Sequence, residues 1–535
     1  MKLQRISLCD FRAFPGPARY EFHFGGCNHL LIYGENGSGK TSVFRALVEF
    51  FDANATATPF VDLKNFFSDS AHGAPLDCGR VELEFEVPPV PPGTQATRSV
   101  HAWTQPTATV AEIKPSTDPN IQQLNRRKGL LDYQSLLRAN LSELDAYGRR
   151  KRPNLFRLMV TEMLSELEIM QPGGTIRTLG ELWLDFSRVT SQNQYYRGDA
   201  RARVESAAAT FNDSMTRAMV ALKSRADGLL STFFGHEVVL SFVYTNSTVH
   251  WHRKPGARLV KDGELWFTLT FKGRGLDHYD SVLNEAKQSA VALCVYFAAL
   301  LDGKPKGVAG YPRLLVLDDV LIGLDMQNRL PVLRMLEKEF ADDGWQIILL
   351  THDRVWYDYA AHEAFGIKWT CHELFADRSP LAGGTWLDVP LLRTPQQGAG
   401  DYLQRARQHM LEHDHKAAAM YARAAYESAL RKYCETRHPK MPFYDDSHKI
   451  KSNQFLIEVE QDIKDSNRKV NGVVSPVPPG DLAAATAVFS DVRLNRQQVL
   501  NPMSHAHSVS LTVPEVQAAI DSVQSLLDAL LSIRK

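Results

Sequence analysis

The sequence predicts an α/β protein with a mixed sheet, a helical insert and a C-terminal all-helical domain. Three observations support this prediction. A short apolar run at 29–33 leads through a glycine-rich segment into a helical pattern. Strand patterns lie on both sides of a mostly helical block at 135–234, which indicates one sheet domain interrupted by an insert. A segment rich in Pro, Gly and Thr then precedes a strongly helical pattern at 401–435 and two more near the C-terminus.

These patterns divide the chain into an interrupted α/β domain and two appendages. Alternating or continuous apolar runs predict strands near the N-terminus and again between 237 and 350. The predicted parts are the first part of the α/β domain at 1–137, the helical insert at 138–235, the second part of the α/β domain at 236–377, a linker at 378–400 and the helical domain at 401–535.

The composition is that of a globular protein. Hydrophobic residues make up 44% of the 535 residues and charged residues 23%, which excludes a disordered or fibrous chain. The 61 Lys and Arg residues balance 61 Asp and Glu residues, so the formal net charge is zero. A neutral chain is a poor candidate for a protein that coats nucleic acid, although a local basic groove remains compatible with it.

Nothing in the sequence predicts secretion or insertion into a membrane. The first residues lack the long apolar core of a signal peptide, and the longest apolar stretch, 290–301, is too short to cross a bilayer. The six cysteines are scattered without a C-x-x-C pair, which favours reduced thiols over a disulfide or zinc framework. We therefore expect a cytoplasmic protein.

Residues 34–41, GENGSGKT, match the complete G-x-x-x-x-G-K-[ST] phosphate-loop pattern between a strand and a helix. Glycines allow consecutive backbone N–H groups to surround a phosphate, and the following helix N-terminus favours negative charge. Lys40 is expected to reach the β- and γ-phosphates, and the Thr41 hydroxyl to bind Mg²⁺. The predicted ATP-binding residues here are Asn36, Gly37, Ser38, Gly39, Lys40, Thr41 and Ser42.

A second element supplies carboxylates. Residues 314–317 form an apolar strand that ends in Asp318 and Asp319, and ligands of open α/β sheets bind at the carboxyl ends of strands. We expect Asp318 to hold Mg²⁺, directly or through water, and Asp319 to act as the base that orients the attacking water.

The order of motifs resembles that of the ABC-type ATPases, in particular their RecF/SMC-like branch. The phosphate loop is followed by the acidic strand, by Gly323-Leu324-Asp325, and by His352 at the end of the next apolar strand. Residues 11–14, FRAF, are similar to the segment that opens this branch. The resemblance implies that His352 senses the γ-phosphate, that Asp325 lies at a dimer interface and that Arg12 contacts the nucleotide.

The resemblance also implies a signature segment that caps the γ-phosphate from a second subunit. Residues 283–287, LNEAK, stand at its place, with Asn284 and Lys287 as the candidate contacts. Asn284 replaces the usual Ser and Ala286 the usual Gly, while Asp319 replaces the more usual Glu. These departures favour a slow, switch-like ATPase that forms a homodimer or higher oligomer through ATP-sandwiched heads.

The family also uses a glutamine that touches Mg²⁺ and lies before the insert. Residues 129–137 are the best match for its loop. Gln134 is the residue of the right type, whereas Asp132 lies nearer the expected spacing.

The appendages carry weaker signals. Two basic runs, 126–128 and 149–152, could contact a phosphate backbone but equally suit solvated helix ends. His409 and His413 lie on one predicted helix face without evident partners for a metal. The tail is loosely similar to HEPN-type domains, yet Arg496 and His505 are separated by more residues than the Arg and His of RNases in that class.

The plan of residues 1–375 resembles the bacterial anti-phage ATPases of the Septu type, including versions attached to retrons. This resemblance implies a regulatory ATPase that controls a partner HNH nuclease, with a reverse transcriptase or nucleic acid as further candidate partners. A RecF/SMC-like ATPase of DNA repair or chromosome maintenance is one alternative. An RNase toxin that uses the C-terminal domain is another.

Overall fold

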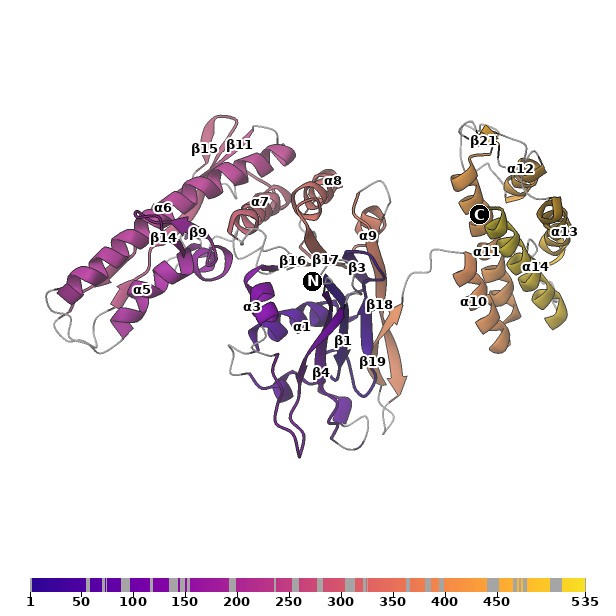
Figure 1. Ribbon diagram of the computed structural model, residues 1–535, viewed down its shortest axis with the longest axis horizontal. Helices are drawn as coiled ribbons and strands as arrows, with labels where there is room; N and C mark the ends of the chain where they lie inside the picture. Colours follow the sequence, from indigo (N-terminus) through magenta and orange to yellow (C-terminus); the bar gives the residue numbers. More distant parts are fainter. Residues whose placement is uncertain are drawn as a thin grey trace. The chain divides into compact units, whose positions relative to one another are not determined.

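The chain folds into two compact units, Met1–Thr394 and Pro395–Lys535, which are described separately (Figure 1). The computed structural model describes residues 2–53, 58–69, 73, 75–87, 97–115, 119–133, 143–144, 150–151, 154–191, 199–234, 237–252, 259–276, 282–303, 313–320, 324, 326–361, 366–380, 386–393, 399–439, 452–464, 469–470, 473–474, 479–500 and 512–534.

A six-stranded mixed sheet with the order β19-β18-β3-β17-β16-β6 forms the centre of the first unit. Neighbouring strands are parallel except β19, which runs antiparallel to β18. The strands are β3 (His29–Gly34), β6 (Lys128–Asp132), β16 (Arg313–Asp318), β17 (Trp345–Thr351), β18 (Trp369–Pro380) and β19 (Trp386–Arg393). Such parallel strands, buried on both faces, explain the continuous apolar runs in the sequence.

Helices cover both faces of this sheet. Helix α1 (Lys40–Asp52) packs its apolar residues into one core together with Leu314 and Val316 of β16. Leu315 and Leu317 point the other way, into the core that contains α7 (Glu285–Gly303). The other helical segments of this unit near the sheet are η1 (Phe60–Leu63), α3 (Pro119–Arg126), α8 (Met326–Met335), η5 (Leu336–Ala341) and α9 (Arg354–Ala361).

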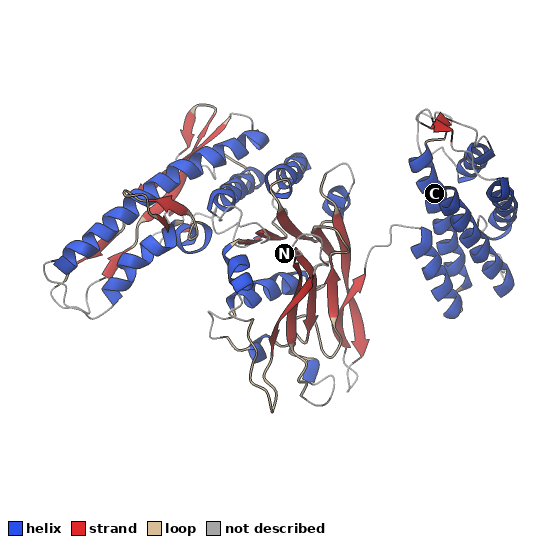
Figure 2. Cartoon of the chain, viewed as in Figure 1, coloured by secondary structure: helices blue, strands red, loops and turns tan. Residues whose placement is uncertain are grey.

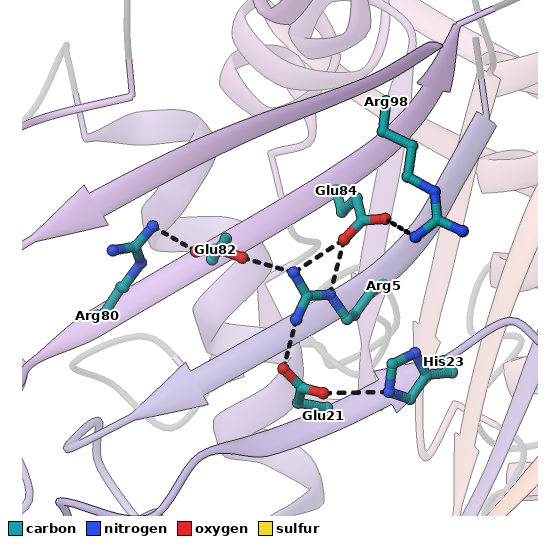
Figure 3. A network of polar contacts seen from close by, with 7 residues as sticks. All are labelled: Arg5, Glu21, His23, Arg80, Glu82, Glu84 and Arg98. Carbon is teal, nitrogen blue, oxygen red and sulfur yellow. Dashed lines mark hydrogen bonds and ion pairs between the residues drawn. The ribbon is translucent and has the colours of Figure 1, made fainter. Parts of the chain in front are cut away.

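A four-stranded antiparallel sheet, β2-β1-β4-β5, carries a charged network. Its strands are β1 (Lys2–Cys9), β2 (Tyr20–His23), β4 (Arg80–Val87) and β5 (Thr97–Thr104). Arg5 donates to Glu84 at 2.9 Å, forms an ion pair with Glu82 at 2.8 Å and also binds Glu21 (Figure 3). Arg80 also binds Glu82, and Arg98 pairs with Glu84 at 2.9 Å, so the two almost fully buried carboxylates are each held between Arg5 and a second arginine.

The insert is part of a larger layer than the sequence predicts. Helices α5 (Leu179–Ser191) and α6 (Asp199–Phe234) follow a π-helix, η2 (Leu158–Met163), and the β9-β10 hairpin (Glu168–Met170 and Ile176–Thr178). Strands β11 (Val238–Thr245), β14 (Glu264–Phe271) and β15 (Arg274–Leu276) form their own sheet beside the β12-β13 hairpin (Thr248–His250 and Leu259–Lys261). Two more short strands, β7 (Glu143–Leu144) and β8 (Arg150–Lys151), pair with each other.

Side-chain bonds tie this small sheet to α6. The Asn212 side chain on α6 accepts hydrogen bonds from the Tyr244 hydroxyl at 2.6 Å and the Ser247 amide at 2.9 Å. The boundary predicted between 235 and 236 therefore falls inside one compact layer, because the strands after it pair with one another and not with the central sheet.

The predicted linker at 378–400 is wrong over most of its length. Strand β18 continues to Pro380, and β19 occupies residues 386–393. Pro390 lies in β19, which is at the edge of the sheet, where proline removes no ladder hydrogen bond. The connection between the two units therefore begins near residue 394.

Where the structure describes it, the C-terminal unit is helical apart from one short strand pair, β20-β21 (Lys469–Val470 and Val473–Val474) (Figure 2). Its helices are α10 (Ala399–Leu411), α11 (His415–Arg437), α12 (Ser452–Lys464), α13 (Pro479–Asn495), η7 (Arg496–Leu500) and α14 (Val513–Arg534). The helical pattern at 401–435 belongs to two helices, because the Asp414 side chain accepts the Ala417 amide at 2.9 Å and caps α11.

These observations confirm the predicted fold class: a mixed-sheet α/β domain with a largely helical insert and a C-terminal helical unit. Among the described helices, none has the length and apolar character needed to cross a membrane.

A buried histidine makes the stability of the first unit depend on pH. His29 on β3 is 6% exposed, and its Nδ1 accepts the Ile347 amide at 3.2 Å. Burial, together with the charge of Lys2, lowers the pKa of His29 to about 4, against about 6.5 in an unfolded chain. The unfolded chain therefore binds the proton more readily, so this contribution to stability is complete above pH 6.5 and is lost as the pH falls towards 4.

We predict that His29→Asn weakens the pH dependence of unfolding, because the amide oxygen can accept the same hydrogen bond without titrating. Between pH 8 and pH 5 the wild-type chain should lose about 2 kcal/mol more free energy of unfolding than this variant. All eight tryptophans lie in the first unit, so chemical denaturation followed by tryptophan fluorescence reports on that unit alone. His23→Asn, at an exposed position, is the control; equal pH dependence in wild type and His29→Asn would contradict the assignment.

Candidate nucleotide-binding site

The phosphate loop connects the end of β3 to the start of α1. Gly37 and Gly39 have positive φ angles of 85° and 103°, which L-residues with side chains rarely adopt. A Cβ atom on Gly39 would also lie 3.3 Å from both Phe14 and Pro390. These two glycines therefore let the backbone turn tightly in front of the helix, where its free N–H groups can face an anion.

Lys40 is held over this loop. Its Nζ donates to the carbonyl oxygens of Gly34 at 2.7 Å and Glu35 at 3.0 Å, and lies 3.9 Å from a carboxylate oxygen of Asp319. The side chain is only 4% exposed, and burial lowers its pKa, while the charges of Asp319, Asp318 and Glu35 act in the opposite direction. The Lys40 ammonium is thus held beside the loop in a place with little water. Its attraction for a phosphate is therefore weakly screened.

The other polar residues of the predicted loop differ in exposure and contacts. Asn36 is exposed and Ser38 is buried. The Ser42 hydroxyl accepts the Ala13 amide at 3.4 Å, which joins the first turn of α1 to the segment at 11–14.

Asp318 ends β16 next to Thr41. It is 4% exposed, and its Oδ1 atom is buried with no hydrogen-bond partner among the described residues. Burial and the charge of Asp319 raise its pKa to about 6, although a hydrogen bond with Thr41 and the charge of Lys40 favour the ionised form. A buried carboxylate oxygen without a donor is a strong candidate for a cation ligand.

The pair formed by Thr41 and Asp318 fits Mg²⁺. A hydroxyl and a carboxylate are hard oxygen ligands, and Mg²⁺ in nucleotide sites commonly uses one or two protein ligands together with phosphate oxygens and water. The described residues contain no cluster of three or more His, Cys, Asp or Glu side chains that could hold a metal ion.

Asp319 and His352 meet at the ends of neighbouring strands. Asp319 has a positive φ of 53°, and its amide donates to the Leu350 carbonyl at 3.0 Å. Its Oδ1 lies 2.9 Å from both the amide nitrogen and the Nδ1 of His352. The structure therefore brings together the two residues for which the sequence predicts roles in hydrolysis.

Asn284 lies immediately before α7. Its Oδ1 accepts the Lys287 amide at 3.0 Å, so the side chain caps the helix and leaves its Nδ2 group able to donate to a ligand. The Lys287 ammonium lies 5.7 Å from the centre of the Phe271 ring. This segment therefore presents an exposed helix start that Asn284 caps.

Arg12 directly precedes Ala13, which contacts the first turn of α1, but the Arg12 guanidinium points towards Glu49. Its Nη2 lies 3.5 Å from Glu49 on α1, and its positive φ of 48° places it in a tight turn. The predicted contacts Asp325 and Gln134 lie outside the described residues.

Asp132 is the residue that the sequence offers beside Gln134 for the Mg²⁺ contact, because it lies nearer the expected spacing. It ends β6 in direct register with Asp318 on β16. Partners in adjacent parallel strands project to the same face, so Asp132 faces α1, where Arg45 lies 3.6 Å from its carboxylate. The signal in the sequence was its position directly after an apolar strand; the pairing of that strand with β16 was not visible.

The weaker signals of the sequence outside the phosphate loop can be followed only where the structure describes their residues. Of the basic run at 126–128, Arg127 is buried, while Arg126 and Lys128 bind Glu166 and Asp52, so the run is not the exposed stripe that a phosphate backbone needs. In the C-terminal unit, Arg496 is 6% exposed and hydrogen-bonds Tyr426. His505 and the run at 149–152 have no described side chains.

The fold and the site define a phosphate-loop nucleotide-binding head. Within it, residues 5–87 match the family model of the AAA domain. No curated protein matches the chain.

Solved structures with some similarity include heads of SMC proteins. The SMC head bound to the C-terminal winged-helix domain of ScpA has 14% identity and a TM-score of 0.39, covering 74% of this chain and 98% of that one. The SMC head domain from Thermotoga maritima has 15% identity and a TM-score of 0.34, with coverage of 74% and 100%. The dimeric bacterial ABC transporter cassette MJ0796 has 10% identity and a TM-score of 0.22, with coverage of 69% and 93%.

We predict that Lys40→Ala weakens ATP binding by about 100-fold or more, because the phosphates lose two charge-assisted hydrogen bonds in a buried site. Titration calorimetry with the full chain measures the loss. Lys338→Ala, at an exposed position remote from the loop in sequence, is the control for the removal of a lysine. ATP affinity unchanged in Lys40→Ala would refute the phosphate-loop assignment.

Proposed function

We propose that this chain binds ATP with Mg²⁺ and hydrolyses it slowly, as a nucleotide-dependent switch. The observation that carries this proposal is the convergence of Lys40, Asp318, Asp319 and His352 at one edge of the central sheet. Lys40 would hold the β- and γ-phosphates, while Thr41 and Asp318 would hold the metal ion. The metal, when bound, would neutralise charge on the phosphates.

The arrangement of Asp319 supports slow turnover. Its carboxylate lies 3.9 Å from the Lys40 Nζ and 2.9 Å from the His352 Nδ1, and as a general base it would accept the proton of the attacking water. The same two contacts restrict the movement of the short Asp319 side chain, whose backbone has a positive φ. His352 occupies one side of the Asp319 carboxylate, so a water molecule would approach this base from another side. His352 is therefore a positioning residue for the base.

We predict that Asp319→Asn keeps ATP binding but abolishes hydrolysis, because an amide of the same shape cannot accept the proton. Phosphate release measures turnover, and calorimetry measures binding. Asp319→Glu is the matched control: it keeps the carboxylate and should retain hydrolysis. If Asp319→Asn hydrolysed ATP at the wild-type rate, another group would have to be the base.

We further propose that two heads sandwich ATP, with Asn284 of one head against the γ-phosphate held by the other. The support is the Asn284 Nδ2 group, which donates to none of the described residues and lies at the exposed start of α7, where a helix N-terminus adds a favourable dipole.

Asn284→Asp tests this arrangement, because the new carboxylate can still cap α7 but would repel a phosphate. We predict that the variant folds and binds ATP as a monomer, but fails to dimerise when ATP is added. Analytical ultracentrifugation with and without ATP measures the assembly. Asn284→Ser, which restores a hydroxyl donor, should dimerise; normal ATP-dependent dimerisation of Asn284→Asp would exclude the proposed contact.

The cellular role that we propose is regulation of a partner nuclease in bacterial anti-phage defence. Its support is the resemblance of residues 1–375 to the Septu-type ATPases, together with a separate helical unit available for protein contacts. Purification of the chain from its native cells, followed by mass spectrometry, tests this role. Recovery of an HNH nuclease supports it, whereas recovery of replication proteins alone would favour the DNA-maintenance alternative.

A further inference from the structure

A cavity of about 600 Å³ lies inside the first unit, between helix α1, strand β6, the π-helix η2 and helix α7. This volume is within the range of sites that bind small organic molecules, about 300–1,000 Å³. Each of the four elements contributes apolar side chains to the walls, among them Val48, Leu130, Met159 and Val295. On α1 the wall begins at Phe44, so the cavity is separate from the phosphate loop.

The wall formed by η2 has an unusual backbone. This segment is a π-helix of six residues, and π-helical turns are rare and often occur at functional sites. Two of its lining residues, Met159 and Met163, have flexible side chains that can adapt to the shape of a ligand. Glu162, on the same π-helix, is exposed, so its carboxylate lies at a side of the cavity that is open to solvent.

Aromatic rings form a second part of the lining. They come from three elements: Phe44 of α1, Phe267 of β14 and Tyr296 of α7. The face of an aromatic ring attracts organic cations. Burial and the negative charges of Glu162 and Asp132 raise the pKa of Tyr296, so its hydroxyl stays protonated close to both carboxylates.

The charged groups of the lining disfavour an anionic ligand. Each cationic group already has a carboxylate partner within the lining: Arg45 with Asp132 at 3.6 Å, Arg126 with Glu166 at 2.5 Å and Lys128 with Asp52 at 3.3 Å. An anion would have to compete with one of these carboxylates. Glu162 adds a fourth carboxylate, so four carboxylates against three cations give the lining a formal charge of −1.

We propose that this cavity binds a small amphipathic amine. Its ring or chain would lie among the apolar walls, and its ammonium group would lie near Glu162 and the Tyr296 ring. Carboxylates and aromatic faces are the groups that recognise an organic ammonium ion. The inference does not depend on the proposed binding of ATP, because the cavity and the phosphate loop are lined by different residues.

The test uses naphthylmethylamine as the probe, with titration calorimetry on the full chain. Naphthylmethanol and naphthylacetate have the same ring with a neutral or an anionic group. We expect the amine to bind most tightly and the acetate most weakly. Saturating ATP should not displace the amine, because the two sites are separate.

Two variants locate the bound amine. Glu162→Gln should weaken amine binding about fivefold and leave naphthylmethanol binding unchanged, because only the amine loses an ion pair with an exposed carboxylate. Glu168→Gln, at an exposed position on β9, is the matched control and should change neither affinity. Ala292→Phe fills part of the cavity from α7 and should weaken binding of both compounds, with circular dichroism as the check that the variant folds.

The opposite results would overturn the proposal. Absence of amine binding, or equal affinity for the three naphthyl compounds, would remove the amine site. Unchanged amine affinity in Glu162→Gln would show that the ammonium group lies elsewhere. Displacement of the amine by ATP would place the probe in the nucleotide site. A chain that bound the amine but not ATP would refute the proposed function and leave the amine site intact.

Discussion

The parallel register of β3, β17 and β16 determines what the site can do. Leu350 of β17 pairs with Ile32 of β3 on one side and with Asp318 of β16 on the other. Residues that follow these strands consequently emerge at the same edge of the sheet, although they are separated by hundreds of positions in the chain. The hydrogen bond from the Asp319 amide to the Leu350 carbonyl continues this ladder one residue beyond the strand and fixes the direction of the Asp319 side chain. A shift of one residue in this register would turn Asp318 to the opposite face of the sheet, away from Thr41.

Local signals account for the parts of the site that the sequence predicted. The phosphate loop needs glycines with positive φ, a lysine and a hydroxyl within eight residues. All of its functional residues therefore lie in one short segment of the sequence. Asp318 and Asp319 are predicted because they end an apolar strand, whereas His352 is predicted because the order of motifs resembles that of the ABC-type ATPases. Their mutual distances came from strand pairing, which is a long-range property.

The same distinction explains what the sequence did not predict. Pro390 favoured a linker over a strand in the sequence, although an edge strand such as β19 tolerates proline. The position of Asp132 beside Asp318 depends on the pairing of β6 with β16. The layer around α6 was assigned to two domains, since strand patterns do not say which sheet a strand joins.

The path of β19 has a mechanical consequence. Pro390 in this strand lies 3.3 Å from the position of a Cβ on Gly39, and the polypeptide leaves the first unit only a few residues later. A pull on the connection to the C-terminal unit would load an edge strand that touches the phosphate loop, at a glycine that has no side chain to resist displacement. Tension along the chain and binding of a phosphate would then both act on the contact between Pro390 and Gly39.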